Sequence, residues 1–306
     1  MNTLHLAYAV EVERCGSITQ AAENLYMAQP NLSKAMKELE ESLGFPIFRR
    51  SSRGVTPTAR GREFLAYARS ILAQVRNIEA LADDPAHPAQ RLSLALPHTG
   101  LALQCFSRLV GELSPWEPLN ITLREMGAAQ AIAAVADGTL RMGVLRWPVP
   151  LAQQQEEALQ GKSLAWQPIR EYDALLLFSS QHPLAQRAGL APAQLAGYPR
   201  VRYGDEEDFP QPAPQAEQGT SSSLQVFHRA ALLQLLRLLP SAYCWSAPEE
   251  ADALQAHGLA QRPCAGAARW QEVLIYPAGY RLSPLEQQFA ALLQAAASPP
   301  SVPPSL

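Results

Sequence analysis

Cysteine is scarce in this chain of 306 residues, where it occurs only at positions 15, 105, 244 and 264. The four cysteines form no CxxC pair and have no histidines near them at metal-ligand spacing, so we expect no metal site. Free thiols are the expected state, and a redox-sensing pair of Cys244 with Cys264 is the alternative.

Long apolar runs are also missing. No stretch approaches the ~18 consecutive apolar residues that a transmembrane helix requires, so we expect no membrane span. The first segment, MNTLHLAYAVEVERCGS, lacks a basic start, a long apolar core and a small-residue cleavage site, which argues against a secretory signal. We therefore expect a cytoplasmic protein.

Neither sign of charge is in large excess. The formal net charge is -3, charged residues make up 17% and apolar residues 47% of the chain, a composition typical of globular proteins. The length favours about two domains. A near-neutral total does not exclude a nucleic-acid binder, because an acidic second domain can hide a local basic face.

The first 60 residues contain signals for three short helices separated by tight turns. Ser17 is a suitable N-cap for the second helix, and the third begins at Gln29-Pro30, where proline is tolerated. Leu32, Met36 and Leu39 follow at helical spacing. This order predicts a helix-turn-helix, and the following FPIFRRSSRGVTPT predicts a small β-wing.

From Thr58 the sequence predicts a long helix whose apolar residues are spaced by four, three, four and three. This spacing predicts a coiled-coil-like seam that pairs with a second helix. Packing of the helix on its own domain is the alternative. The seam consists of Phe64, Ala68, Ile71, Val75 and Ile78.

After residue 91 the pattern changes to alternating strands and helices. RLSLALP, LNITLREM and MGVLRW predict strands with helices between them, an order that favours a parallel sheet covered on both faces. A second such set follows, and QEVLIYPAG with SPLEQQFAALLQA predicts a last strand and helix. The acidic, proline-rich GDEEDFPQPAPQAEQG predicts a surface loop or a mobile lid.

The run from Gly16 to Gly61 closely resembles the helix-turn-helix signature of the LysR family of transcriptional regulators. Ala21-Ala22, Gln29-Pro30, Leu39-Glu40, Leu43-Gly44 and Thr56-Pro57-Thr58 all stand in the family's order and spacing. The region after residue 91 resembles the family's effector domain less closely. Arg141 replaces the usual aspartate, and the turn at 239–243 is altered, which places the chain in a divergent branch.

The resemblance implies an α/β protein in which an all-α winged helix-turn-helix and a linker helix precede a two-lobed, periplasmic-binding-protein-like domain of type 2. We assign residues 1–58 to the DNA-binding domain and 59–90 to the dimerisation helix and hinge. Residues 91–300 form the effector domain, with lobe I at 91–165 and 266–300 and lobe II at 166–265. Residues 301–306 are expected to form a disordered tail.

Double-stranded DNA is the partner that the first domain implies. Between positions 28 and 62, seven lysines and arginines face three glutamates, and such an excess can replace counterions on the phosphate backbone. Amide and hydroxyl groups at the start of the third helix suit base edges, and wing arginines suit phosphates. The candidate DNA contacts are Ser17, Gln29, Pro30, Asn31, Ser33, Lys34, Lys37, Arg49, Arg50 and Arg53.

A small-molecule effector is the ligand that the second domain implies, with a carboxylate as a candidate class and no cofactor. Ligands of open parallel sheets bind beyond the carboxyl ends of the strands, where helix N-termini favour anions. We expect Thr99 to donate a hydrogen bond and Arg146 or Arg202 to pair with negative charge. The candidate contacts are His98, Thr99, Gly100, Ala128, Arg146, Arg202, Tyr203, Ser221 and Ser222.

Two other functions are weighed against this one. A small-molecule-binding enzyme is disfavoured because the sequence has no nucleophile elbow, no phosphate-binding glycine loop and no catalytic pair. A DNA-binding protein without ligand control would make the second domain redundant. The resemblance further implies a homodimer that pairs into a tetramer, with RNA polymerase as a candidate partner.

Overall fold

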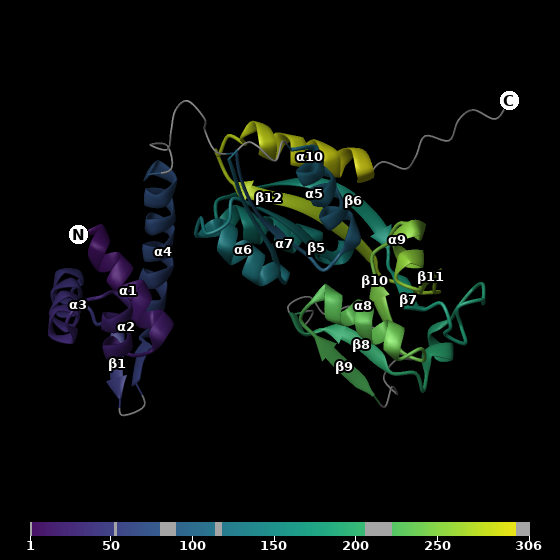
Figure 1. Ribbon diagram of the computed structural model, residues 1–306, viewed down its shortest axis with the longest axis horizontal. Helices are drawn as coiled ribbons and strands as arrows, with labels where there is room; N and C mark the ends of the chain where they lie inside the picture. The colour runs from purple at the N-terminus through teal and green to yellow at the C-terminus, as the bar shows by residue number, and fades with distance from the viewer. Residues whose placement is uncertain (1, 52–53, 80–89, 114–117, 206–221, 298–306) are drawn as a thin grey trace. The chain divides into compact units, whose positions relative to one another are not determined.

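The computed structural model describes the chain except residues 1, 52–53, 80–89, 114–117, 206–221 and 298–306. The expected hinge, most of the expected acidic loop and the tail at 301–306 lie outside the described residues. The chain divides into two compact units (Figure 1), an N-terminal one that contains α1–α4 and a C-terminal one that begins with β3.

The N-terminal unit is a winged helix-turn-helix followed by a long helix, as predicted. Its elements are α1 (Thr3–Cys15), α2 (Ile18–Asn24), α3 (Gln29–Leu43), β1 (Phe48–Ser51), β2 (Gly54–Pro57) and α4 (Ala59–Glu79). α1 ends at Gly16, whose φ of 62° is a left-handed conformation that favours glycine. Ser17 then caps α2, because its Oγ accepts a hydrogen bond from the Gln20 backbone N–H at 3.3 Å.

One core holds the three short helices, the wing and the start of α4 together. Ala21 of α2, Leu32 and Leu39 of α3, Ile47 before the wing and Leu65 of α4 are all at most 1% exposed and belong to the same cluster. The apolar stripe predicted for the third helix is therefore its buried face, and the polar residues between are turned away from the core.

α3 begins without a side-chain cap. Ala28 occupies the N-cap position with extended backbone, and only its carbonyl oxygen takes part, accepting from the Asn31 and Leu32 backbone N–H groups. Pro30 in the first turn has no N–H to satisfy, so it lowers the number of uncapped donors.

α4 presents two different faces. Leu65 and Ala68 are buried, and the Arg69 guanidinium donates to the Glu13 carboxylate of α1. Ile71 and Ile78 are 37% and 66% exposed. The predicted seam is therefore split: Ala68 is enclosed within its own chain and has no surface to offer to a second helix, which corrects that part of the seam.

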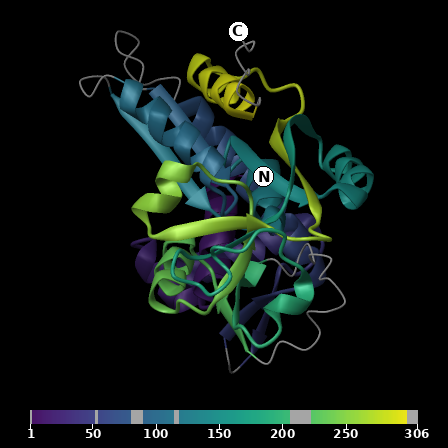
Figure 2. The ribbon, with the colours of Figure 1, turned by 90° about the vertical axis from the view of Figure 1, so that its right-hand side faces the viewer.

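The C-terminal unit contains two five-stranded sheets (Figures 1 and 2). The first has the strand order β4-β3-β5-β12-β6. Its elements are β3 (Gln90–Leu96), α5 (Gly100–Glu112), β4 (Leu119–Glu125), α6 (Ala128–Ala136), β5 (Met142–Pro148), a 3-10 turn η2 (Val149–Leu151), α7 (Ala152–Gly161), β6 (Leu164–Asp173), β12 (Arg269–Pro277) and α10 (Pro284–Ala297).

Strand direction in this sheet differs partly from the expectation. β3 pairs in parallel with β4 and β5, as the βαβαβ order predicted. β12 is antiparallel to both β5 and β6, so the sheet is mixed. β6 was not predicted, and it extends the first sheet to Asp173. The expected lobe boundary at 165/166 therefore falls inside a strand of the first lobe.

Helices cover both faces of the first sheet. Leu101 and Leu109 of α5 and Phe289 of α10 share one buried cluster with β3, and α5 lies beside α10 in Figures 1 and 2. Ile132 of α6 and Leu159 of α7 belong to the cluster on the opposite face. The carboxyl ends of β3 and β4 each lead within a few residues into the start of a helix, α5 and α6, an arrangement that positions a site there.

The second sheet has the order β11-β7-β10-β8-β9. Its elements are β7 (Leu175–Ser179), a 3-10 turn η3 (Pro192–Leu195), β8 (Arg200–Tyr203), β9 (Ser223–Val226), α8 (Arg229–Leu238), β10 (Tyr243–Ser246), α9 (Ala251–Ala256) and β11 (Leu259–Pro263). β8 is parallel to β9 and β10, whereas β7 is antiparallel to β10 and β11.

The last helix explains how the chain accommodates Arg141. α10 begins with a capping box, because Ser283 Oγ accepts from the Glu286 N–H and Glu286 Oε2 accepts from the Ser283 N–H at 2.7 Å. The Tyr280 hydroxyl donates to the fully buried Glu286, and Arg141 donates to that hydroxyl at 2.9 Å. The arginine thus belongs to a network that satisfies a buried carboxylate.

Within the described ranges, no helix is both long and apolar enough to cross a bilayer. The same part of the chain contains no group of three or more histidine, cysteine or acidic side chains placed to hold a metal ion. Its cysteines are free thiols, and three of the four are buried.

Candidate DNA-binding and effector sites

The first turns of α3 carry an exposed polar face. Gln29, Pro30, Asn31, Lys34 and Lys37 are all exposed, opposite the buried stripe that contains Leu32. Weak ion pairs at 3.7–3.8 Å along the helix join the two lysines to Glu38 and Glu41. Lysines in such exposed pairs can exchange a carboxylate for a phosphate at little cost.

The wing and α3 lie together. The half-buried Ser33 Oγ accepts a hydrogen bond from Arg50 Nη1 at 3.3 Å, and Arg49 and Arg50 are exposed on β1. The structure therefore brings the two predicted groups, the helix residues and the wing arginines, onto one side of the unit. Ser17 lies at the cap of α2, and Arg53 lies outside the described residues.

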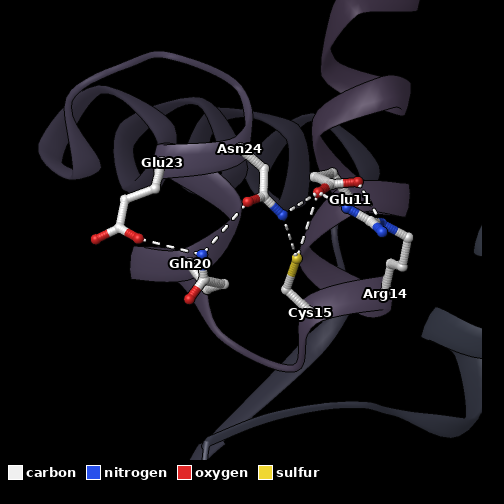
Figure 3. Close-up of polar contacts among 6 residues, drawn as sticks. All are labelled: Glu11, Arg14, Cys15, Gln20, Glu23 and Asn24. Atoms are coloured by element: carbon white, nitrogen blue, oxygen red, sulfur yellow. Dashed lines mark hydrogen bonds and ion pairs between the residues drawn. The ribbon is translucent and has the colours of Figure 1, made fainter.

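A polar cluster joins α1 to α2 (Figure 3). Asn24 Nδ2 donates to Glu11 Oε1 at 2.8 Å and lies 3.2 Å from Cys15 Sγ, and Arg14 donates to both oxygens of Glu11. Hydrogen bonds from Arg14 and Asn24 lower the pKa of Glu11 to about 2. The charged carboxylate thus helps to hold the first helix against the helix-turn-helix.

A small cavity, partly open to solvent, lies at the carboxyl ends of β3, β4 and β5. Both lobes contribute, because Asp205 follows β8 of the second sheet. The cavity combines an arginine, a histidine, one carboxylate and an apolar lining. The lining residues are Pro97, His98, Met126, Gly127, Ala128, Val144, Leu145, Arg146, Asp205 and Trp270.

His98 connects the lobes across this cavity. Its Nε2 lies 2.9 Å from Asp205 Oδ2, its Nδ1 lies 3.9 Å from Glu125, and its ring stacks on Tyr203 with centroids 4.2 Å apart. Burial disfavours the imidazolium, but the carboxylates of Asp205 and Glu125 outweigh burial and raise the pKa of His98. His98 is therefore held toward its charged form between two carboxylates.

Arg146 is fixed at the floor of the cavity by its neighbours on the sheet. Its guanidinium lies over the Trp270 ring, 5.2 Å from the centroid. Glu272, which is 1% exposed, is opposite Arg146 in the β5–β12 register and accepts from Arg170 Nε at 2.8 Å on β6. Charged and aromatic side chains of β5, β6 and β12 thus lie together beside the cavity.

The structure gathers only part of the predicted effector set. His98, Ala128 and Arg146 line the cavity, and Tyr203 lies behind His98. Other predicted residues lie outside the lining, and Ser221 falls outside the described residues. Those outside the lining are Thr99, Gly100, Arg202 and the exposed Ser222. Thr99 is buried, and its hydroxyl makes no hydrogen bond within the described chain.

Asp205 and Trp270 were missed by the sequence-based reasoning. Asp205 lies two residues after the predicted strand PRVRY, so its position after a strand was a usable signal. Trp270 lies near the start of β12, and antiparallel pairing brings that start to the carboxyl end of β5, with Trp270 opposite Pro148. That pairing has no local signal in the sequence.

A second hollow is lined by Gly100, Glu125, Arg229, Glu249 and neighbours on α5, α8 and α9. Arg229 donates to both oxygens of the buried Glu249, one of them at 2.7 Å. Its cationic and acidic groups are already paired, so we assign no ligand to this hollow.

The fold and these surfaces define a class: a winged helix-turn-helix module followed by a two-lobed α/β domain with a cavity between its lobes. The family model for the bacterial regulatory helix-turn-helix protein, lysR family, matches residues 4–62, and the LysR substrate binding domain matches residues 85–298. The chain belongs to the LysR family.

Two relatives illustrate the degree of similarity. The HTH-type transcriptional regulator YnfL of Escherichia coli K12 is 30% identical over 204 residues, which cover 65% of this chain and 64% of YnfL. AlsR of Bacillus subtilis is 29% identical over 208 residues, 67% of this chain and 65% of AlsR. The similar region thus spans just under two thirds of these relatives.

Solved structures share the fold of the whole chain at low identity. CbnR in complex with its target DNA has a TM-score of 0.61 at 20% identity and covers 97% of this chain and all of that one. ArgP from Mycobacterium tuberculosis has a TM-score of 0.59 at 19% identity, with 96% of each chain covered.

Proposed function

We propose that the protein is a non-enzymatic, sequence-specific transcriptional regulator of the cytoplasm whose binding to double-stranded DNA is controlled by a small-molecule effector. The observation that carries the proposal is the shared surface of α3 and the wing, where Arg50 bonds to Ser33 beside the exposed Gln29, Asn31 and Lys34. In this proposal residues 1–58 bind DNA, 59–90 dimerise and 91–300 sense the effector.

α3 is the recognition helix in this proposal. A helix with exposed amide and ammonium groups on its first turns can enter the major groove and meet base edges, and the wing arginines can meet phosphates beside it. CbnR, which shares this fold, has been solved in complex with its target DNA, and this supports the same use of the fold here. The proposed contacts are those predicted from the sequence, Ser17 and Arg53 included.

The cavity between the lobes is the effector site in this proposal. Arg146 and His98 provide positive charge and hydrogen-bond donors, while Trp270 and Met126 provide apolar surface, a combination typical of sites for small carboxylates. LysG from Corynebacterium glutamicum has been solved with a bound effector, arginine, which supports a ligand-binding role for this domain.

A second copy of the chain is the other proposed partner. Ile71 and Ile78 lie one below the other on α4 and are substantially exposed, and Tyr67 beside them is 66% exposed. Exposed large apolar side chains at helical spacing favour a partner helix. We propose a homodimer through α4, further pairing into a tetramer, with RNA polymerase as a partner at the promoter.

The proposal is tested with the full-length protein and genomic DNA fragments. We expect selection from such fragments to recover a preferred site and a thermal-shift screen of metabolites to find a compound that raises Tm and alters affinity for that site. Lack of any preferred site would contradict sequence-specific binding. A protein that selects a site but responds to no stabilising compound would instead be a regulator without ligand control.

Thr99 allows a finer test of the effector site. Thr99 adjoins His98 just outside the cavity lining, is 1% exposed at the start of α5, and its hydroxyl makes no hydrogen bond with the described residues. Thr99→Ala is expected to weaken the response to the effector while affinity for DNA without effector stays unchanged. Equal loss of both would count against a role in sensing.

A further inference from the structure

A carboxylate from the chain itself lies among the anion-binding groups of the cavity. Asp205 follows β8, and its side chain is 14% exposed. Its Oδ2 lies 2.9 Å from His98 Nε2, a charge-assisted hydrogen bond between the two lobes. The same cavity is lined by Arg146.

Gly127 permits the close approach of this carboxylate. A Cβ atom built on Gly127 would lie 2.7 Å from Asp205 Oδ2 and 2.8 Å from Asp205 Cβ, distances that real Cβ atoms do not show. Gly127 immediately precedes α6, whose first backbone N–H groups have no acceptor within the helix. The carboxylate therefore lies against the positive end of α6.

The electrostatic environment favours the charged carboxylate. Burial disfavours ionisation of Asp205, but the hydrogen bond from His98 and the charges of His98 and Arg146 outweigh it and lower the pKa of Asp205. His98 is in turn favoured in its charged form by Asp205 and Glu125. Arg146, the protonatable ring of His98 and a helix N-terminus thus lie around one internal carboxylate.

We propose that Asp205 is a tethered anion that occupies the position of the effector's carboxylate, so that effector binding is an exchange of one carboxylate for another. This inference rests on the proposed effector site. When the effector's carboxylate binds His98 and Arg146, it displaces Asp205, and the Asp205–His98 hydrogen bond between the lobes breaks. The exchange connects occupancy of the cavity to the contact between the lobes.

The exchange also sets the class of effector. A tethered group has a high effective concentration, commonly millimolar or above, so a simple carboxylate cannot displace it at low concentration. A successful ligand needs further contacts, and Trp270 and Met126 offer an apolar surface for them. The structure therefore favours a carboxylate with an apolar or aromatic body.

Formate is a suitable probe because it is little more than a carboxylate. In Asp205→Ala full-length protein, formate is expected to bind with a Kd at least about tenfold lower than in the wild type. The measurement is the shift of the His98 ring nitrogens by NMR on histidine-labelled protein. Equal binding by both proteins, or binding by neither, would overturn the proposal.

Two further variants separate this exchange from a loss of structure. Gly127→Ala keeps every charge but excludes the Asp205 side chain, so it is expected to lower the pKa of His98. Asp205→Asn keeps the size of the side chain and removes its charge, so it should have the same effect if the alanine variant does not fold. An unchanged pKa of His98 in both variants would refute the assignment.

Asp173→Ala is the matched control, because Asp173 is an exposed carboxylate of the same unit outside the cavity. It is expected to leave formate affinity and the pKa of His98 as in the wild type. These assays need no DNA. If Asp205→Ala tightens formate binding but no ligand changes DNA binding, the proposed function alone is refuted. If a ligand changes DNA binding but Asp205→Ala does not tighten formate binding, only the exchange is refuted.

Discussion

At the scale of single residues, two buried histidines of the C-terminal unit respond oppositely to pH. The carboxylates beside His98 raise its pKa, whereas burial lowers the pKa of His182. His182 is held neutral, because its Nδ1 accepts from the Leu184 N–H and its Nε2 donates to the Ser241 carbonyl. Each ring therefore contributes stability on a different side of its ordinary pKa of 6.5.

The first prediction concerns His98→Gln. A raised pKa in the folded state gives stability that is complete below pH 6.5 and is lost as pH rises through the folded-state pKa. The lowered pKa of Asp205 gives stability that is lost only as pH falls below its ordinary 3.8. We therefore expect the loss of Tm caused by His98→Gln to be larger at pH 6 than at pH 8.5.

His182→Gln is the control for this pH series. The folded state disfavours a charged His182, so the contribution of this residue to stability falls as pH drops through 6.5. The difference in Tm between this variant and the wild type should shrink toward acid, opposite to that of His98→Gln. If the loss of Tm changed with pH in the same direction in both variants, the ion pairs of His98 could not be the cause of that pH dependence.

The second prediction concerns the buried ion pair of Arg170 with Glu272. Glu272 is 1% and the Arg170 side chain 14% exposed, so Glu272→Ala leaves a buried guanidinium without its partner. The expected cost is about 3–5 kcal/mol in the free energy of unfolding, measured by denaturant titration of the full chain. The exposed pair of Glu171 with Arg269 on the same strands is the control.

Glu171→Ala removes a carboxylate from an exposed ion pair, in which the side chains of Glu171 and Arg269 are 41% and 62% exposed. Water therefore screens the attraction between the two charges. We expect its cost to stay below about 1 kcal/mol. Equal losses for Glu272→Ala and Glu171→Ala would mean that burial does not determine the strength of these pairs.

At the scale of secondary structure, the uncapped start of α3 predicts a stabilising substitution. Ala28 already has the extended backbone of an N-cap residue but no side-chain acceptor. Ala28→Ser adds an acceptor for the free N–H groups of the first turn and should raise the free energy of unfolding by about 1 kcal/mol. Ala66→Ser, at an exposed position inside α4, should not stabilise, because serine is a poorer helix former than alanine.

The exposed side of α4 gives a fourth prediction. Ile71→Lys together with Ile78→Lys places charge on the apolar stripe proposed to contact a second copy, which should shift the protein toward monomer at micromolar concentration in sedimentation velocity. Tyr26→Ser is the control, since Tyr26 is 98% exposed in the turn between α2 and α3. A doubly substituted protein that remains fully dimeric would contradict an α4 interface.

Elements were predictable from the sequence where local signals determine them. Ser17, Pro30 and the apolar stripe of α3 act within one or two turns, so the winged helix-turn-helix was predicted correctly. β6 and the direction of β12 depend on pairing between residues about 100 positions apart, such as Arg170 with Glu272. The structure has a cavity at the sheet edge where the sequence predicts the effector site; its contributor Trp270 depends on such distant pairing, whereas Asp205, two residues after a predicted strand, had a local signal.

At the scale of the whole molecule, charge is distributed unequally along the chain. The stretch from 28 to 62 has a local excess of four positive charges, whereas the net charge of the chain is -3, so the remainder is acidic. The field of such a molecule favours an approach to DNA through the basic end and disfavours contact elsewhere. The low total charge is therefore compatible with strong electrostatic binding by one unit.

The last prediction follows from this distribution. Each phosphate neutralised by the protein adds roughly -0.9 to the slope of log K against log salt concentration. Arg49→Gln and Arg50→Gln should each make the slope shallower by about one, measured by fluorescence anisotropy with the selected DNA site. Arg108→Gln removes an exposed arginine of α5 in the C-terminal unit and should leave the slope unchanged. If all three variants keep the wild-type slope, the wing arginines do not contact phosphates, and the polar face of α3 would have to bind DNA without them.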